Sequence, residues 1–192
     1  VHNDPDSIQF TVKAHKPTQI SFEEMLPGDI LIGEDTGHDA LHEVSKGDTL
    51  TYTGRLYVQP VKQKIEALKS RYTGNTDNIS TKDIESTFVT ELRIPDGLII
   101  PETVTATLTR NDLFEITNVI RGNNVIKITM SLKKKYSKFT DLFNDVEAVP
   151  VVLNVDVPGI KVADYNAAAA RLTVKGTVTG AFTGKAIVPS GK

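Results

Sequence analysis

The sequence predicts an antiparallel β-sandwich with two short inserted helices, and three observations support this fold class. Many short stretches rich in Thr, Val and Ile alternate between apolar and polar side chains, which is typical of a pleated, half-buried surface. Turn-forming Pro, Gly, Asn and Asp residues separate these stretches. Helical periodicity is confined to two places, and both stretches are too short to build a helix bundle.

The first half of the chain contains four predicted strands. Each alternates or follows a turn signal, with Pro27-Gly28 before the third strand and Gly47-Asp48 before the fourth. The strands are expected at residues 8–13, 19–22, 29–32 and 49–58.

The second half continues the β pattern. We expect its strands at residues 87–94, 104–108, 113–120, 125–132, 151–157 and 171–188. The tetrapeptide at residues 121–124 predicts the clearest hairpin, and Pro158-Gly159 is expected to close the strand before it. Gly176, Gly180 and Gly184 are spaced four apart, which predicts bends or bulges in the last strand.

Two helices are predicted from apolar residues spaced three and four apart. The first is expected over residues 61–72, because Pro60 occupies a position where a helix can begin. The second is expected around residues 139–146, with Thr140 or Ser137 as its N-terminal cap. Both helices are expected to lie on the β framework as crossovers.

About nine strands with frequent turns favour an immunoglobulin-like sandwich. A domain boundary near residue 46 is the alternative, but the preceding segment has too few apolar side chains to form its own core. We therefore predict one domain over residues 1–192.

Composition argues against several classes of protein. The formal charge is −2, which argues against a nucleic-acid binder that depends on neutralising phosphates. No run of about 18 apolar residues is present, so we expect no membrane insertion, and residues 1–7 do not have the pattern of a signal peptide. The chain has no Cys, so disulfides, thiolate catalysis and Cys-ligated zinc are all excluded.

His38 and His42 are the nearest approach to a metal site, since they are four residues apart with Asp39 between them. If this segment binds a metal, zinc is the expected ion. The same two histidines could sense pH, because imidazole gains a proton between about pH 8 and 5. The more ordinary interpretation, which we favour, is a solvated acidic loop, and no cofactor is expected.

Catalytic patterns are missing from the sequence. No His follows residue 42, and neither a nucleophile motif nor a phosphate-binding glycine loop occurs in the right context. The run Lys133-Lys134-Lys135 is interpreted as a solvated strand end. We therefore predict that the chain is not an enzyme.

Three segments resemble immunoglobulin-like modules of Gram-positive cell-wall-anchored adhesins and fimbrial stalks. They are residues 46–53 (KGDTLTYT), residues 93–101 (RIPDGLIIP) and the Thr-, Gly- and Ala-rich residues 174–189. The resemblance implies that the domain is cut from a longer surface protein, with an extracellular, cell-surface location and a role in attachment or as a stalk. It also implies a Lys–Asn or Lys–Asp isopeptide bond, for which Lys13 with Asn154 or Asp156 is the pairing to test.

The function expected from these observations is adhesion or a stalk role, with no catalysis. The partners would be a host or bacterial surface protein or glycan and neighbouring domains of the same chain, with no nucleic acid. The contact regions are expected in the loops at residues 33–46 and 73–82. The alternative is a carbohydrate-binding or metal-dependent lectin-like module that uses exposed rings among Tyr52, Tyr57 and Tyr72.

Overall fold

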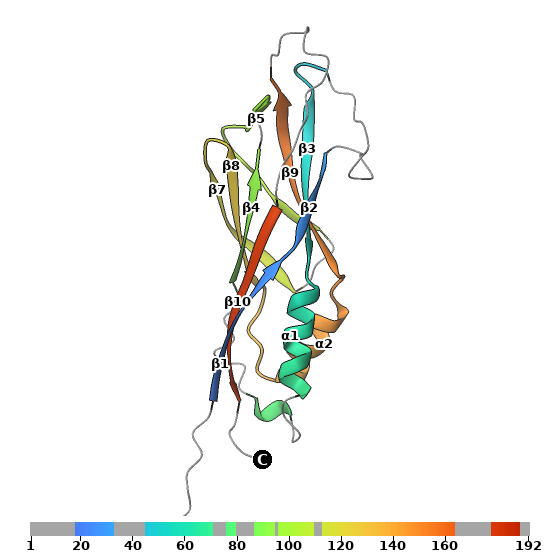
Figure 1. The fold of residues 1–192 in the computed structure, drawn as a ribbon, viewed down its shortest axis with the longest axis vertical. Helices are drawn as coiled ribbons and strands as arrows, with labels where there is room; N and C mark the ends of the chain where they lie inside the picture. Colours follow the sequence, from blue (N-terminus) through green and yellow to red (C-terminus); the bar gives the residue numbers. More distant parts are fainter. Residues whose placement is uncertain are drawn as a thin grey trace, which may run out of the picture.

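Two antiparallel β-sheets with a pair of helices at one end make up the computed structural model of the protein (Figure 1). The structure describes residues 18–32, 45–70, 76–79, 87–94, 96–109, 113–163 and 178–188. The molecule is elongated, and the strands run roughly along its long axis with the twist typical of β-sheets. The mainly β, two-sheet architecture expected from the alternating pattern is confirmed.

The first sheet has the strand order β1-β10-β4-β8-β7, and every neighbouring pair is antiparallel. The second sheet has the order β2-β3-β9-β5, and β6 also pairs with β9. The strands of the first sheet are β1 (Thr18–Leu26), β4 (Thr87–Arg93), β7 (Phe114–Arg121), β8 (Val125–Leu132) and β10 (Val178–Val188). Those of the second are β2 (Gly28–Ile32), β3 (Thr49–Tyr57), β5 (Leu98–Ile99), β6 (Thr107–Thr109) and β9 (Val152–Val162).

The core lies between the sheets because alternate residues of the central strands point inward. In β3 every even-numbered residue from Leu50 to Leu56 is buried, and β4 and β9 alternate in the same way. Phe88 is fully buried and meets Phe114 edge to face, with ring centroids 4.9 Å apart. Buried side chains of both sheets and both helices belong to one hydrophobic cluster.

Helices α1 (Gln59–Ser70) and α2 (Phe139–Ala148) pack against each other at one end of the sandwich (Figure 1). Each buries residues at helical spacing: Val61, Ile65 and Leu68 in α1, and Phe139, Leu142 and Val146 in α2. The one-turn helix η1 (Thr76–Asn78) lies against α2. Both helices were expected from their periodicity, and both are confirmed. No helix among the described residues is long and apolar enough to cross a membrane.

Three lysine side chains of α1 contact α2 and β1. Lys62 Nζ donates to the backbone oxygens of Val146 and Glu147, each at 2.9 Å, where the carbonyls at the end of α2 carry partial negative charge. Lys69 Nζ lies 3.9 Å from the centroid of the Phe143 ring. A third lysine of α1, Lys64, forms an ion pair of 3.1 Å with Glu24 of β1. These contacts attach the helices to each other and to the first sheet.

The predicted cap of α2 is wrong. Lys138 occupies the N-cap position with extended backbone angles, and its side chain forms no capping hydrogen bond. Thr140 is already inside the helix, and Ser137 precedes the cap. Packing of Phe139 and Leu142 therefore fixes the start of this helix without a side-chain cap.

The predicted turn at Pro158-Gly159 is instead a bulge inside β9. Both residues lie opposite Thr51 of β3, since Val157 pairs with Tyr52 and Ile160 with Leu50. Gly159 has a φ of 84°, a conformation that glycine adopts at little cost. The extra residue changes which side chains face the core, because Leu153, Val155 and Val157 are buried before the bulge and Ile160 and Val162 after it.

The bulges predicted at Gly180 and Gly184 do not form, because the register between β1 and β10 is continuous past both. Gly180 allows close packing of the two sheets: a Cβ atom there would lie 3.0 Å from Leu56 Cδ2 and 3.3 Å from Leu26 Cβ. Gly176 lies outside the described residues, as does the predicted strand at residues 8–13.

Most other predicted strands are confirmed, to within four residues at their ends. The hairpin at residues 121–124 joins β7 to β8, and the Gly122 N–H donates to the Val125 oxygen at 2.7 Å. The strand expected at residues 104–108 is much shorter, since only β6 forms there.

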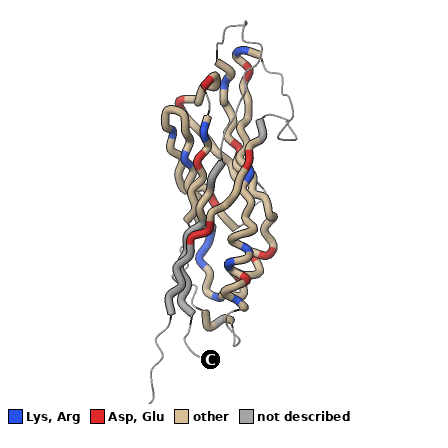
Figure 2. The backbone as a smooth tube through the Cα atoms, in the orientation of Figure 1, with Lys and Arg blue, Asp and Glu red and all other residues tan. Residues whose placement is uncertain are grey.

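The chain passes from one sheet to the other at Pro27, which separates β1 from β2. Pro27 accepts a hydrogen bond of 2.9 Å from the Tyr57 N–H, so the crossing point is attached to the end of β3. At the end of the molecule away from the helices, backbone hydrogen bonds join neighbouring segments. The Gly47 N–H donates to Val162 (3.0 Å), and the Ala163 N–H donates to Gly97 (2.8 Å). Charged residues of both signs occur along the whole length of the described backbone (Figure 2).

Candidate functional site

The outer side of the second sheet carries a cluster of polar side chains, which we call the polar face. Alternation in β3 puts Thr53, Arg55 and Tyr57 on the side away from the core. The strand register then places Asp29 and Asn154 opposite Arg55, one on each neighbouring strand. The polar face comprises Asp29, Thr53, Arg55, Tyr57, Asn154 and Asp156.

Asp29 is the centre of the polar face. Its two oxygens accept hydrogen bonds from Arg55 Nε at 2.5 Å and Arg55 Nη2 at 2.6 Å, and Oδ2 also accepts one from the Tyr57 hydroxyl at 2.8 Å. The side chains of Asp29 and Arg55 are only 12% and 24% exposed, so the pair is shielded from water. The hydrogen bonds to the Asp29 carboxylate raise the pKa of both Arg55 and Tyr57, because each bond needs the donor to keep its proton.

Asn154 and Asp156, the predicted isopeptide residues of β9, both lie on the polar face. Asp156 Oδ1 accepts a hydrogen bond of 2.7 Å from the Thr53 hydroxyl. The Asn154 side-chain oxygen is buried and has no hydrogen-bond partner among the described residues. Lys13, the predicted third member, lies outside the described residues, so the isopeptide bond stays a prediction.

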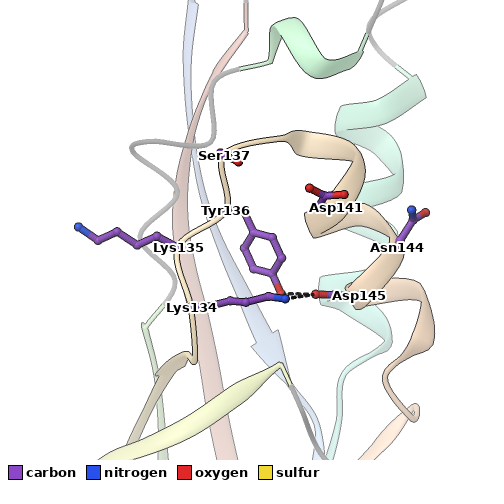
Figure 3. A pocket seen from close by; sticks show the side chains of 7 residues that line it. All are labelled: Lys134, Lys135, Tyr136, Ser137, Asp141, Asn144 and Asp145. Carbon is purple, nitrogen blue, oxygen red and sulfur yellow. Dashed lines mark hydrogen bonds and ion pairs between the residues drawn. The ribbon is translucent and has the colours of Figure 1, made fainter.

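A second polar cluster surrounds an open depression of about 310 Å³ between α2 and the segment that follows β8. We call it the α2 depression (Figure 3). In this view Lys134 and Tyr136 reach toward Asp145 on the helix, while Lys135 points away from it. The lining residues are Lys134, Lys135, Tyr136, Ser137, Asp141, Asn144 and Asp145.

The Asp145 carboxylate links the two walls of the α2 depression. Its Oδ2 atom accepts a hydrogen bond of 2.7 Å from the Tyr136 hydroxyl and pairs with Lys134 Nζ at 3.2 Å. The hydrogen bond from Tyr136, supported by Lys134, lowers the pKa of Asp145. Burial of the ring, together with this hydrogen bond, raises the pKa of Tyr136. The exposed Ser137, Asp141 and Asn144 add a hydroxyl, a carboxylate and an amide that could hydrogen-bond a polar ligand.

The predicted metal and pH-sensing residues His38, Asp39 and His42 lie outside the described residues, so both predictions stay open. Within the ranges that the structure describes, no group of three His, Cys, Asp or Glu side chains is placed to hold a metal ion.

The tyrosines proposed as a carbohydrate platform behave differently from one another. Tyr52 is fully buried and donates its hydroxyl hydrogen to the Arg93 backbone oxygen at 2.8 Å, and burial raises its pKa. Tyr57, at opposite parity, is half-buried on the polar face, whereas Tyr72 lies outside the described residues. Tyr52 and Tyr57 point to opposite sides of β3, as the alternation of the strand requires, and neither ring is an exposed platform.

The predicted contact loops are described only in part. Residues 45 and 46 belong to an exposed turn, and of residues 73–82 the structure describes 76–79, in which Asn78 is exposed and Ile79 is buried. The hydrogen bonds of Asp29 were not predicted from the sequence. Arg55 and Tyr57 share one strand face, which was a usable signal, but nothing local places Asp29 beside them.

Comparisons with protein-family models, with curated proteins and with solved structures find no match for this chain.

Proposed function

We propose that this chain is a non-catalytic adhesion or stalk domain of a bacterial cell-surface or fimbrial protein. The elongated two-sheet scaffold in Figure 1 supports this proposal, because such a scaffold presents turns and strand faces at a distance from its point of attachment. The resemblance of residues 46–53 and 93–101 to surface modules points in the same direction.

The main support for this proposal is that the carboxylates of Asp29 and Asp145 are both engaged by neighbouring side chains. Asp29 is occupied by Arg55 and Tyr57, and Asp145 by Tyr136 and Lys134. Each carboxylate holds neighbouring strands or segments in place, which is what a rigid scaffold needs. We therefore assign these clusters to bracing of the domain.

We further propose that the sandwich is related to the immunoglobulin-like type. Two antiparallel sheets of short strands around one core support the relationship. The strand order departs from that type at one edge, because β1 and β10 pair in the same sheet, whereas the first and last strands of an immunoglobulin domain lie in different sheets.

The proposed partner is a protein or glycan on a host or bacterial surface, and the proposed location is extracellular. A screen of the purified chain against immobilised matrix proteins and a glycan array tests this proposal. We expect saturable binding to at least one surface component. If the folded chain, checked by far-UV circular dichroism, binds to no component of either panel, the adhesion role is refuted.

The α2 depression favours a second candidate, a carbohydrate-binding module of the lectin type. Its hydroxyl, amide and carboxylate groups match the hydrogen-bonding needs of a sugar. Asn144→Ala should then weaken any glycan signal, whereas Asn118→Ala, at an exposed position of β7, should not. A metal-dependent form would lose the signal in EDTA, and an unchanged signal would refute that form.

A further inference from the structure

The chain enters and leaves the described fold at the same end of the molecule. Thr18, at the start of β1, pairs with Val188, at the end of β10. From there the two strands run antiparallel over nine consecutive pairs to Leu26 and Gly180. Figure 1 shows both strands reaching one end of the long axis, while β5 lies near the other.

This arrangement decides how a pull on the chain would act. Hydrogen bonds between antiparallel strands lie perpendicular to the strands. Force applied at Thr18 and Val188 would separate the open end of the strand pair and load one pair of residues at a time. Force applied along the strands would instead load all of the hydrogen bonds together.

In the described part of the chain, the outer half of this pair has the fewest neighbouring strands. Among the described residues, β4 pairs with β10 only from Val178 to Thr183, so the five residues that follow pair with β1 alone. Two strands without further neighbours are marginally stable in water. Nearer the body, the ion pair of Glu24 with Lys64 attaches β1 to α1.

At the far end of the molecule, backbone hydrogen bonds hold the turn before β3 against β9. The turn before β3 is joined to β9 by the hydrogen bond from Gly47 to Val162, and the Val162 N–H donates to Asp48 at 2.9 Å. These bonds lie outside the path of a pull applied at Thr18 and Val188. The sandwich body would therefore stay folded while β1 and β10 separate.

We propose that the domain is a pendant head, joined to its parent chain at one end, and not an in-line segment of a stalk. This inference rests on the proposed surface function and favours the adhesion role over the stalk role. Tension along the parent chain would open the β1–β10 pair first, and the body would remain intact to hold a partner at a distance.

Single-molecule force spectroscopy tests the loading geometry on the full chain. Because the sequence contains no Cys, cysteine handles can be placed without ambiguity. One variant carries a first cysteine before residue 1 and a second after residue 192. The matched variant carries Lys46→Cys, in an exposed turn at the far end, with the same cysteine after residue 192.

With handles at both chain ends, we expect an early opening at low force that precedes unfolding of the body. Release of the nine residues of β1 and the five of β10 beyond Thr183 adds about 50 Å at roughly 3.4 Å per residue. With the Lys46→Cys handle, the strands are loaded along their length, so this early opening should be absent and the first unfolding force higher.

Equal first forces in the two geometries, or a higher force with handles at the chain ends, would overturn the pendant role. This outcome is distinguishable from failure of the proposed function, which the binding screen measures without applied force. A chain that binds a surface component yet resists end-to-end pulling would keep the adhesion role and refute the early opening of the β1–β10 pair under tension. A chain that opens early but binds nothing would refute the adhesion role on which the pendant head depends.

Discussion

The sandwich body and the helix end share one apolar core, but the helix end adds contacts made by charged side chains. In the body, buried apolar residues such as Phe88, Ile126 and Leu153 meet between the sheets. At the helix end, Lys62 and Lys69 add hydrogen bonds to carbonyls and a contact with an aromatic ring. Apolar burial depends little on salt or pH, whereas contacts of exposed charges are screened by ions. The two regions should therefore respond differently to the same change in solution.

The largest contrast is expected from removing an aromatic ring in each region. Phe88→Ala should lower the free energy of unfolding by about 3–5 kcal/mol, because the fully buried ring leaves a cavity that its neighbours cannot fill. Phe143→Ala should cost less than half as much, because Phe143 is half-buried and solvent can fill its place. Urea denaturation measures both changes. Equal losses would contradict the distinction between a dry body and a wetter helix end.

Charge also matters in the body, where the polar face is shielded. Asp29→Ala should lower the free energy of unfolding by about 1–3 kcal/mol, because Arg55 and Tyr57 lose a shared acceptor in a half-buried site. Glu115→Ala, at an exposed position on β7, is the control and should change it by less than about 0.5 kcal/mol. If both variants behave alike in urea denaturation, the polar face does not brace the sheet.

The contribution of Lys62 to the free energy of unfolding should depend on the salt concentration. Lys62→Met should lower the free energy of unfolding by about 0.5–1 kcal/mol at low salt, since the two carbonyls at the end of α2 lose a cation. The loss should shrink in about 1 M NaCl, where the Debye length is about 3 Å. Lys127→Met on β8 is the matched exposed control. A loss for Lys62→Met that does not change with salt would mean that the methylene stem, and not the charge, provides the stabilisation.

The smallest effect concerns pH. Hydrogen bonding from Tyr136 keeps the pKa of Asp145 below its ordinary value of 3.8, so the charged carboxylate stabilises the folded state above that pH. This contribution is lost as the pH falls through the lowered pKa. Because the Asp145 side chain is 43% exposed, water screens the interaction and the effect on stability is small.

Tyr136→Phe removes that hydrogen bond, so the pKa of Asp145 should rise toward its ordinary value and the acid side of the stability curve should become flatter. A carboxyl-carbon NMR titration measures this pKa directly. The carboxylate of Asp96, an exposed residue far along the chain, serves as the internal control. An Asp145 pKa that is unchanged in Tyr136→Phe would show that the hydrogen bond from Tyr136 does not lower it.

Local patterns predicted the elements well where one physical rule dominated. The strand at residues 125–132 and its hairpin follow from alternation and a turn signal, and β8 has those bounds. The α2 cap failed because Ser and Thr near the helix start suggested a hydrogen bond, whereas packing of Phe139 fixes the helix without one. The Pro158-Gly159 turn failed because a bulge uses the same residue types as a turn.

Contacts between distant segments could not be predicted in the same way. Asp29 and Arg55 are 26 residues apart, and their contact depends on β2 pairing with β3 in one register. Tyr136 and Asp145 meet only because α2 turns back over the segment that precedes it. Strand order is set by the packing of the whole core, so local periodicity leaves it open.

The bulge at Pro158-Gly159 has a consequence for the length of β9. A strand repeats every two residues, but the two residues of the bulge share one position opposite Thr51, so Ile160 faces the core as Val157 does although it lies three residues further on. Loss of one of these two residues would restore regular alternation and leave Ile160 and Val162 pointing inward. The length of β9 can therefore change by one residue at this position without exposing the core side chains that follow.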